Sequence, residues 1–130
     1  MKNISDVLNL AARLLIAQLF LIGGLGKLGV GYASTLQYME AFGVPGALLV
    51  PAIIFEIGIA CLLIVGWQIR AVAISAALFC IVAGMLFHFD WSDFIQQILF
   101  LKNLAIAGGC LALAAHGAGS LSIDGRLGRE

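Results

Sequence analysis

Four stretches of this sequence are continuously apolar over about 20 residues, the length that an α-helix needs to cross a bilayer. They cover residues 8–28, 46–66, 70–89 and 96–116, approximately. The seven Lys and Arg and the seven Asp and Glu lie mostly at the ends of these stretches, and 62% of the chain is apolar. A closed β-barrel would need shorter, alternating segments. The sequence therefore predicts an all-α integral membrane protein, a four-helix bundle that forms a single transmembrane domain over residues 1–130.

The first stretch is longer than the apolar region of a secretory signal, and no A-x-A-like cleavage site closes it. We therefore expect it to remain in the protein as a span.

The segment over residues 29–45 is too polar to span a bilayer, but its apolar residues recur at near-helical spacing. Ser34, with Gln37 three residues later, has the pattern of a capping box at the start of a helix. The sequence predicts a short interfacial helix here, between the first and second spans, that covers Leu36 to Phe42.

Basic residues outside the spans predict the orientation, because cytoplasmic loops carry an excess of Lys and Arg. Lys2 precedes the first span, Arg70 lies between the second and third, and Arg126 and Arg129 end the sequence. We expect both termini on the cytoplasmic side and the interfacial helix on the outer side. Arg70 is then a topology anchor rather than a site residue.

Polar side chains inside the spans are the strongest indication of a site. At about 1.5 Å per residue, Glu56 and Gln18 lie near the midplane, and the other polar groups lie in the outer half. A charge at such depth costs on the order of 2.5–3.5 kcal/mol unless it is paired or hydrated. We therefore predict an outward-opening polar pocket. Its candidate binding residues are Gln18, Lys27, Glu56, His88, Lys102 and Asn103.

Glu56 can be accommodated in two ways. The stem of Lys102 is long enough to reach it, so the two residues form an ion pair if the second and fourth spans are neighbours. Alternatively, burial keeps the acid protonated, as a hydrogen-bond donor or proton carrier. A buried pair could also do no more than fix the register of the helices, without any ligand. The sequence leaves these alternatives open.

Two further features of the first span concern packing. Arg13 lies within reach of the cytoplasmic headgroups, and we interpret it as an anchor whose side chain extends to them. The glycines of "GGLG", just before Lys27, favour close approach of a neighbouring helix rather than a phosphate site.

The cysteines do not indicate redox chemistry, because Cys61, Cys80 and Cys110 all fall within spans and form no C-x-x-C pair. The chain also carries no flavin or nicotinamide fingerprint. We therefore expect no redox centre of the chain's own.

The two histidines lie at opposite ends of the predicted bundle, so His88 and His116 cannot hold one haem between them. His88 lies close to Asp90 and Asp93 in sequence, but we interpret these as solvated loop charges. No metal or haem site is predicted.

Several segments, in this order, resemble the DoxX family of small bacterial inner-membrane proteins: "LIGGLGKL", "QYMEAFGVPG", "EIGIACLLIVGWQIRAVA", "FH" and "LKNLAIAGGCLALAAHGAGSLSID". The resemblance runs over nearly the whole chain and implies a multi-pass protein of the inner membrane. The family's founding association is with a thiosulfate:quinone oxidoreductase, and other members are linked to oxidative-stress complexes. The family pattern highlights Lys27, Glu56, Arg70, His88, Lys102 and Asn103.

These observations lead to one favoured function and two alternatives. The favoured one is a membrane subunit that binds quinone or quinol in the polar pocket and serves a partner oxidoreductase or oxidative-stress complex. The first alternative is a proton-coupled small-molecule transporter that uses Glu56 and acts as a homo-oligomer. The second is a non-catalytic membrane assembly or stress protein. Whether the chain is an enzyme stays open. The expected partners are the lipid bilayer and a redox subunit, and we expect no nucleic acid among them.

Overall fold

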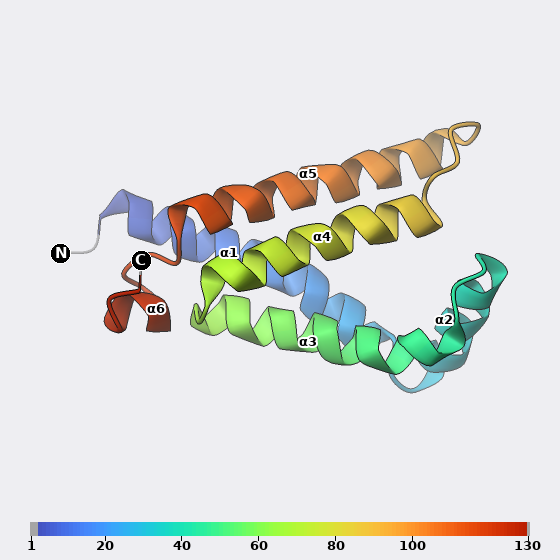
Figure 1. Ribbon diagram of the computed structural model, residues 1–130, viewed down its shortest axis with the longest axis horizontal. Helices are drawn as coiled ribbons and strands as arrows, with labels where there is room; N and C mark the ends of the chain where they lie inside the picture. The colour runs from blue at the N-terminus through green and yellow to red at the C-terminus, as the bar shows by residue number, and fades with distance from the viewer. Residues whose placement is uncertain (1–2, 130) are drawn as a thin grey trace.

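The computed structural model describes residues 3–129, and the described residues contain helices but no strand (Figure 1). Four of the helices are long and apolar enough to cross a membrane. They are α1 (Ile4–Gly26), α3 (Leu49–Val65, preceded by the 3-10 turn η1, Gly46–Leu48), α4 (Ile69–Phe87) and α5 (Phe94–His116). The predicted all-α membrane bundle is confirmed, and each predicted span overlaps one of these helices.

The short helix between the first two spans is also present, as α2 (Val30–Ala41). It begins earlier than predicted, because Gly29 adopts a φ of 60° and lets the chain turn immediately after α1. Ser34 consequently lies inside the helix, where its hydroxyl donates to the carbonyl of Gly31. The prediction of a capping box at Ser34 and Gln37 is therefore wrong.

The long helices pack as two pairs (Figure 1). α1 lies along α3, and α4 lies along α5; smaller contacts between α3 and α4 and between α1 and α5 join the pairs. The core between them contains many small side chains, among them Ala73, Ala76, Ala77 and Ala107. Small residues let helix backbones approach closely, which matters in lipid because burial of apolar surface gives little driving force there.

Gly24 shows how tightly α1 and α3 pack. A Cβ atom at this position would lie 2.8 Å from Cγ1 of Ile57 and 3.2 Å from Cβ of Glu56. The glycines before Lys27 therefore do permit close approach of a neighbouring helix, as the sequence indicated. This approach brings the end of α1 next to Glu56.

Both termini lie at the same end of the bundle, which we call the proximal end; α2 and the turn between α4 and α5 lie at the other, distal end (Figure 1). The C-terminal segment, residues 117–129, covers the proximal end and includes the short helix α6 (Ile123–Arg126). The buried carboxylate of Asp124 accepts hydrogen bonds from the backbone nitrogens of Gln68 and Ile69 at 2.9 and 2.8 Å. Asp124 thus caps the first turn of α4, where backbone N–H groups have no partner within the helix.

Arg13 is completely buried beneath this segment. Its guanidinium donates to the carbonyls of Leu63 and Ile64 at the end of α3, at 3.0 and 3.1 Å, and to the carbonyl of Leu121. The interpretation of Arg13 as an anchor in the headgroups is wrong. The carbonyls at the end of α3 lack partners within the helix, and the planar guanidinium can bind several of them at once.

Arg70 has a structural contact that its sequence position did not reveal. Its guanidinium donates to the carbonyls of Ala114 and Ala115 at the end of α5, at 2.8 and 3.0 Å. A cation at this position also complements the negative end of the helix dipole. The orientation that Arg70 was used to predict remains a prediction, and Lys2 lies outside the described residues.

Replacing Arg13 with methionine should destabilise the bundle strongly, because three carbonyls would lose a charged donor beneath the C-terminal segment. We expect the free energy of unfolding to fall by about 3 kcal/mol or more. Unfolding of the purified protein in mixed detergent and SDS micelles measures this change.

The control is Arg70→Met, which removes an exposed guanidinium with a similar set of acceptors. Its loss of stability should be clearly smaller, because water or headgroups can replace the donor. Equal losses in the two variants would contradict the role given to Arg13.

Candidate binding pocket

A cavity of about 420 Å³ lies in the distal half of the bundle. We call it the distal cavity. Its wall comes from α1, α2, α3 and α4, with one residue of α5, and it is mostly apolar. The polar and ionisable side chains that line it are Lys27, Thr35, Tyr38, Glu56, His88 and Asn103.

Four of the six predicted site residues therefore meet in one cavity: Lys27, Glu56, His88 and Asn103. Gln18 and Lys102 do not line it. Both are exposed on the outer surface of the bundle, so their inclusion in the predicted pocket is wrong. Depth along a helix placed them correctly near the other polar groups, but depth does not say which face of the helix turns inward.

The helix faces explain both corrections. The buried face of α1 carries Arg13, Ala17, Phe20 and Gly24, which repeat at helical spacing, and Gln18 lies about 100° away from Ala17. On α5 the buried residues are Ala107, Cys110, Leu113 and Ala114, and Lys102 points away from that face.

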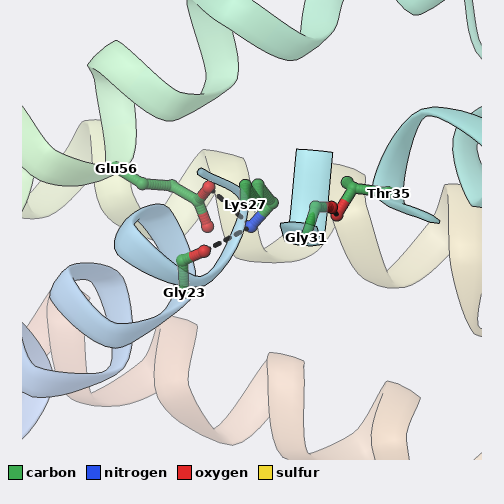
Figure 2. A network of polar contacts seen from close by, with 5 residues as sticks. All are labelled: Gly23, Lys27, Gly31, Thr35 and Glu56. Atoms are coloured by element: carbon green, nitrogen blue, oxygen red, sulfur yellow. Dashed lines mark hydrogen bonds and ion pairs between the residues drawn. The ribbon is translucent and has the colours of Figure 1, made fainter. Parts of the chain in front are cut away.

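The partner of Glu56 is Lys27. Nζ of Lys27 lies 2.7 Å from Oε2 of Glu56 and also donates to the carbonyl of Gly23 at 3.0 Å (Figure 2). The predicted pair of Glu56 with Lys102 is wrong, because α3 packs against α1 and α4 while α5 packs against α4 and α1. The ion pair instead joins the C-terminal end of α1 to α3.

The carboxylate of Glu56 keeps hydrogen-bonding capacity despite this pair. Glu56 is only 6% exposed, and its Oε2 is enclosed beside the ammonium of Lys27, which compensates its charge at 2.7 Å. Gly23 leaves room at the other oxygen, since a Cβ there would lie 3.2 Å from Oε1. The cavity wall therefore contains a buried carboxylate with one oxygen, Oε1, that does not face Lys27.

Helix α2 contributes two hydroxyls to the cavity. The Thr35 hydroxyl donates to the carbonyl of Gly31 at 2.7 Å (Figure 2). The Tyr38 ring packs against Phe42 and Phe87, with centroid distances of 4.8 and 5.4 Å, and so fixes α2 to the end of α4. Burial raises the pKa of the Tyr38 phenol, which therefore stays protonated at neutral pH.

His88 ends α4 at the distal rim of the cavity. Its Nδ1 lies 2.8 Å from Oε1 of Gln96. Because the amide oxygen is an acceptor, Nδ1 of His88 donates to it.

The two aspartates near His88 in sequence have local structural roles. Asp90 accepts hydrogen bonds from the hydroxyl and the backbone nitrogen of Ser92, which lower the pKa of Asp90. Asp93 caps α5 by accepting from the backbone nitrogen of Ile95 at 2.9 Å. Both carboxylates are thus occupied by the turn between α4 and α5.

Apolar side chains connect the cavity to the outer surface of the spans. Leu19 of α1 and Val82 and Leu86 of α4 line the cavity and are 45%, 53% and 46% exposed. These positions lie within spans, so the opening faces hydrocarbon rather than only the aqueous surface.

Sequence reasoning missed three lining residues that carry a hydroxyl or a thiol: Thr35, Tyr38 and Cys80. Thr35 and Tyr38 were missed because nothing in the pattern of α2 indicates that it folds over the cavity. Cys80 was identified as an ordinary apolar residue of a span, and its position on the cavity wall depends on how α4 packs.

The family model described as DoxX matches residues 8–89. The chain belongs to the DoxX family. An inner membrane protein of Escherichia coli (strain K12), YqjF, is 42% identical over 130 residues and covers 100% of this chain and 99% of its own length. A second inner membrane protein of the same organism, YphA, is 33% identical over 127 residues, covering 92% and 90%. No solved structure matches the chain.

Together with the four candidate spans, these DoxX-family relatives support a multi-pass protein of the inner membrane. The matched region contains Lys27, Glu56 and His88, whereas Asn103 lies beyond it.

The role of Lys27 as the partner of Glu56 can be tested by stability. Lys27→Met would leave the buried carboxylate without charge compensation, and we expect a loss on the order of 3 kcal/mol. The double variant Lys27→Met with Glu56→Gln should recover most of this loss, since neither partner is then charged. Unfolding in mixed micelles measures the stability of the wild type, the two single variants and the double variant, which together form a double-mutant cycle.

Lys102→Met is the matched control, because it removes a lysine of the same distal half that does not line the cavity. It should leave the stability close to that of the wild type. If Lys102→Met were as damaging as Lys27→Met and were also rescued by Glu56→Gln, the assignment of the pair would be incorrect.

Proposed function

We propose that this DoxX-family protein is a membrane subunit that binds quinone or quinol in the distal cavity and serves a partner redox protein. The observation that carries the proposal is the buried pair of Lys27 and Glu56 on the wall of a mostly apolar cavity. A quinone combines a flat apolar ring and an isoprenoid tail with two polar oxygens, and the cavity offers surfaces of both kinds.

The size and the opening of the cavity support this ligand class. Small-molecule pockets typically measure about 300–1,000 Å³ and are lined by apolar and aromatic side chains with a few polar groups. At about 420 Å³, the distal cavity has room for a ring with short substituents. The tail would leave past Leu19, Val82 and Leu86 into the hydrocarbon, without crossing a polar surface.

The polar side chains would orient the ring. Lys27 has three N–H groups, of which one donates to Gly23 and one faces Glu56. The third can donate to a ring oxygen, as can the phenol of Tyr38 and the amide of Asn103. Such groups fix the orientation of a ligand whose affinity comes mainly from apolar contact.

A partner follows from the electron balance. Oxidation of a quinol to a quinone releases two electrons and two protons, and the electrons must reach another redox group. The sequence contains no flavin or nicotinamide fingerprint. We therefore propose that a heterologous redox subunit exchanges electrons with the bound quinol, in line with the family's association with oxidoreductase complexes.

The orientation belongs to the same proposal. The excess of basic residues near the proximal end favours cytoplasmic termini, so the distal cavity lies in the outer half of the membrane. In a background with Cys61, Cys80 and Cys110 changed to serine, a cysteine at Gln37 should react with an impermeant maleimide in intact spheroplasts. Protection of Gln37→Cys, combined with labelling of Gly128→Cys, would reverse the orientation.

Binding of a short-chain quinone tests the function directly. The purified wild-type protein should bind ubiquinone-1 or its quinol with a stoichiometry near one per chain, measured by equilibrium dialysis in detergent. The double variant Lys27→Met with Glu56→Gln should bind at least about tenfold more weakly, because it loses charge-assisted hydrogen bonds. Lys102→Met should bind as the wild type does.

Failure of the wild-type protein to bind either form would contradict the proposal and favour the transporter or the assembly function. Equal weakening by Lys102→Met would also contradict it, because that side chain lies outside the cavity.

A further inference from the structure

The distal cavity contains one group that, as a carboxylate, can only accept hydrogen bonds: the side chain of Glu56. Its Oε2 is enclosed and lies 2.7 Å from the ammonium of Lys27, whereas its Oε1 lies beside Gly23, where a Cβ atom would come within 3.2 Å, and is the oxygen offered to a ligand. An ionised carboxylate can only accept. A buried acceptor without a donor is costly, so this atom favours a ligand that brings a donor to it.

A second lining residue contributes an acceptor. The hydroxyl hydrogen of Thr35 is donated to the carbonyl of Gly31, at 2.7 Å, which leaves its oxygen lone pairs free. The Nδ1–H of His88 is likewise used within the protein, on Oε1 of Gln96 at 2.8 Å.

Three lining residues keep donors. Lys27 has one N–H that faces neither Gly23 nor Glu56, and Asn103 presents an amide that can donate or accept. The Tyr38 hydroxyl can also act either way. Unlike these three residues, the carboxylate of Glu56 can only accept, so it is the group that distinguishes a ligand with a donor from a ligand without one.

We propose that the distal cavity selects the reduced, hydroxyl-bearing form of its ligand: quinol rather than quinone. This inference rests on the proposed function, and it specifies which redox form the site takes. A hydroquinone carries two O–H groups, one of which can donate to Glu56. A quinone carries only carbonyl acceptors, which leave the carboxylate without a donor and place oxygen lone pairs near it.

Lys27 has a specific part in this selection. Its ammonium lies 2.7 Å from Oε2, and the carboxylate of this ion pair accepts hydrogen bonds without offering a proton. Lys27 is therefore a positioning residue for the redox selectivity, besides the N–H that it offers to the ligand.

Selective binding of the reduced form changes the redox potential of the bound ligand, because binding and reduction are thermodynamically linked. For a two-electron couple, each tenfold preference for quinol raises the midpoint potential by about 30 mV. A site of this kind holds the ligand in the form that has electrons to give.

The test compares the two redox forms on the same protein. Ubiquinone-1 and ubiquinol-1 are titrated separately into detergent-solubilised wild-type protein under anaerobic conditions, and the dissociation constants are measured by calorimetry. We expect quinol to bind at least about tenfold more tightly, the difference that one hydrogen bond to a charged group supplies. In Glu56→Gln the ratio should fall to about one, since the amide can donate or accept.

Thr35→Val is a second variant, because it removes an acceptor without touching the ion pair and conserves the shape of the side chain. It should lower the ratio by a smaller factor. Lys102→Met should keep the wild-type ratio, because its side chain lies outside the cavity.

The outcomes separate the two proposals. Equal affinities for the two forms in the wild type, or a ratio unaffected by both Glu56→Gln and Thr35→Val, would overturn the inference and leave quinone binding intact. Tighter binding of the oxidised form would overturn it as well. Absence of binding for both forms would instead overturn the proposed function, and the inference would fall with it.

Discussion

The ion pair between Lys27 and Glu56 is the interaction on which the distal half of the protein depends. It links α1 to α3 where glycines bring the two backbones together, and it places a carboxylate on the wall of an apolar cavity. In hydrocarbon neither charge could be kept alone at modest cost. The same contact therefore allows the helices to pack and gives the cavity its chemistry, so structural and functional roles cannot be assigned to separate residues here.

The two ends of the bundle use charge differently. At the proximal end, Arg13 and Asp124 are directed to backbone groups: the guanidinium to carbonyls at the end of α3 and the carboxylate to N–H groups at the start of α4. The guanidinium of Arg13 and both carboxylate oxygens of Asp124 thus form hydrogen bonds within the protein. At the distal end, Glu56 has a counter-charge on Oε2, and its other oxygen, Oε1, lies beside Gly23. The carboxylate at the distal end therefore retains binding capacity for a ligand.

Hydropathy was sufficient to predict the fold, because the length and apolarity of a membrane span are written directly into the sequence. The depth of Lys27, Glu56, His88 and Asn103 was also sufficient to group them. The partner of Glu56 was not predictable: depth suggested Lys102, whereas the choice of partner depends on which helices are neighbours. Gln18 and Arg13 failed for a related reason: whether a polar side chain faces lipid or the bundle depends on the packing of the whole chain.

The contact of Arg13 with the carbonyl of Leu121 also sets an order of assembly. The two residues are 108 positions apart, and Leu121 leaves the ribosome after all four spans. Until then the guanidinium lacks one of its acceptors, and α4 lacks the cap from Asp124. The spans can insert one after another, but the proximal end closes last. A chain interrupted after α5 would leave the guanidinium of Arg13 bonded to α3 alone, without the C-terminal segment that covers it.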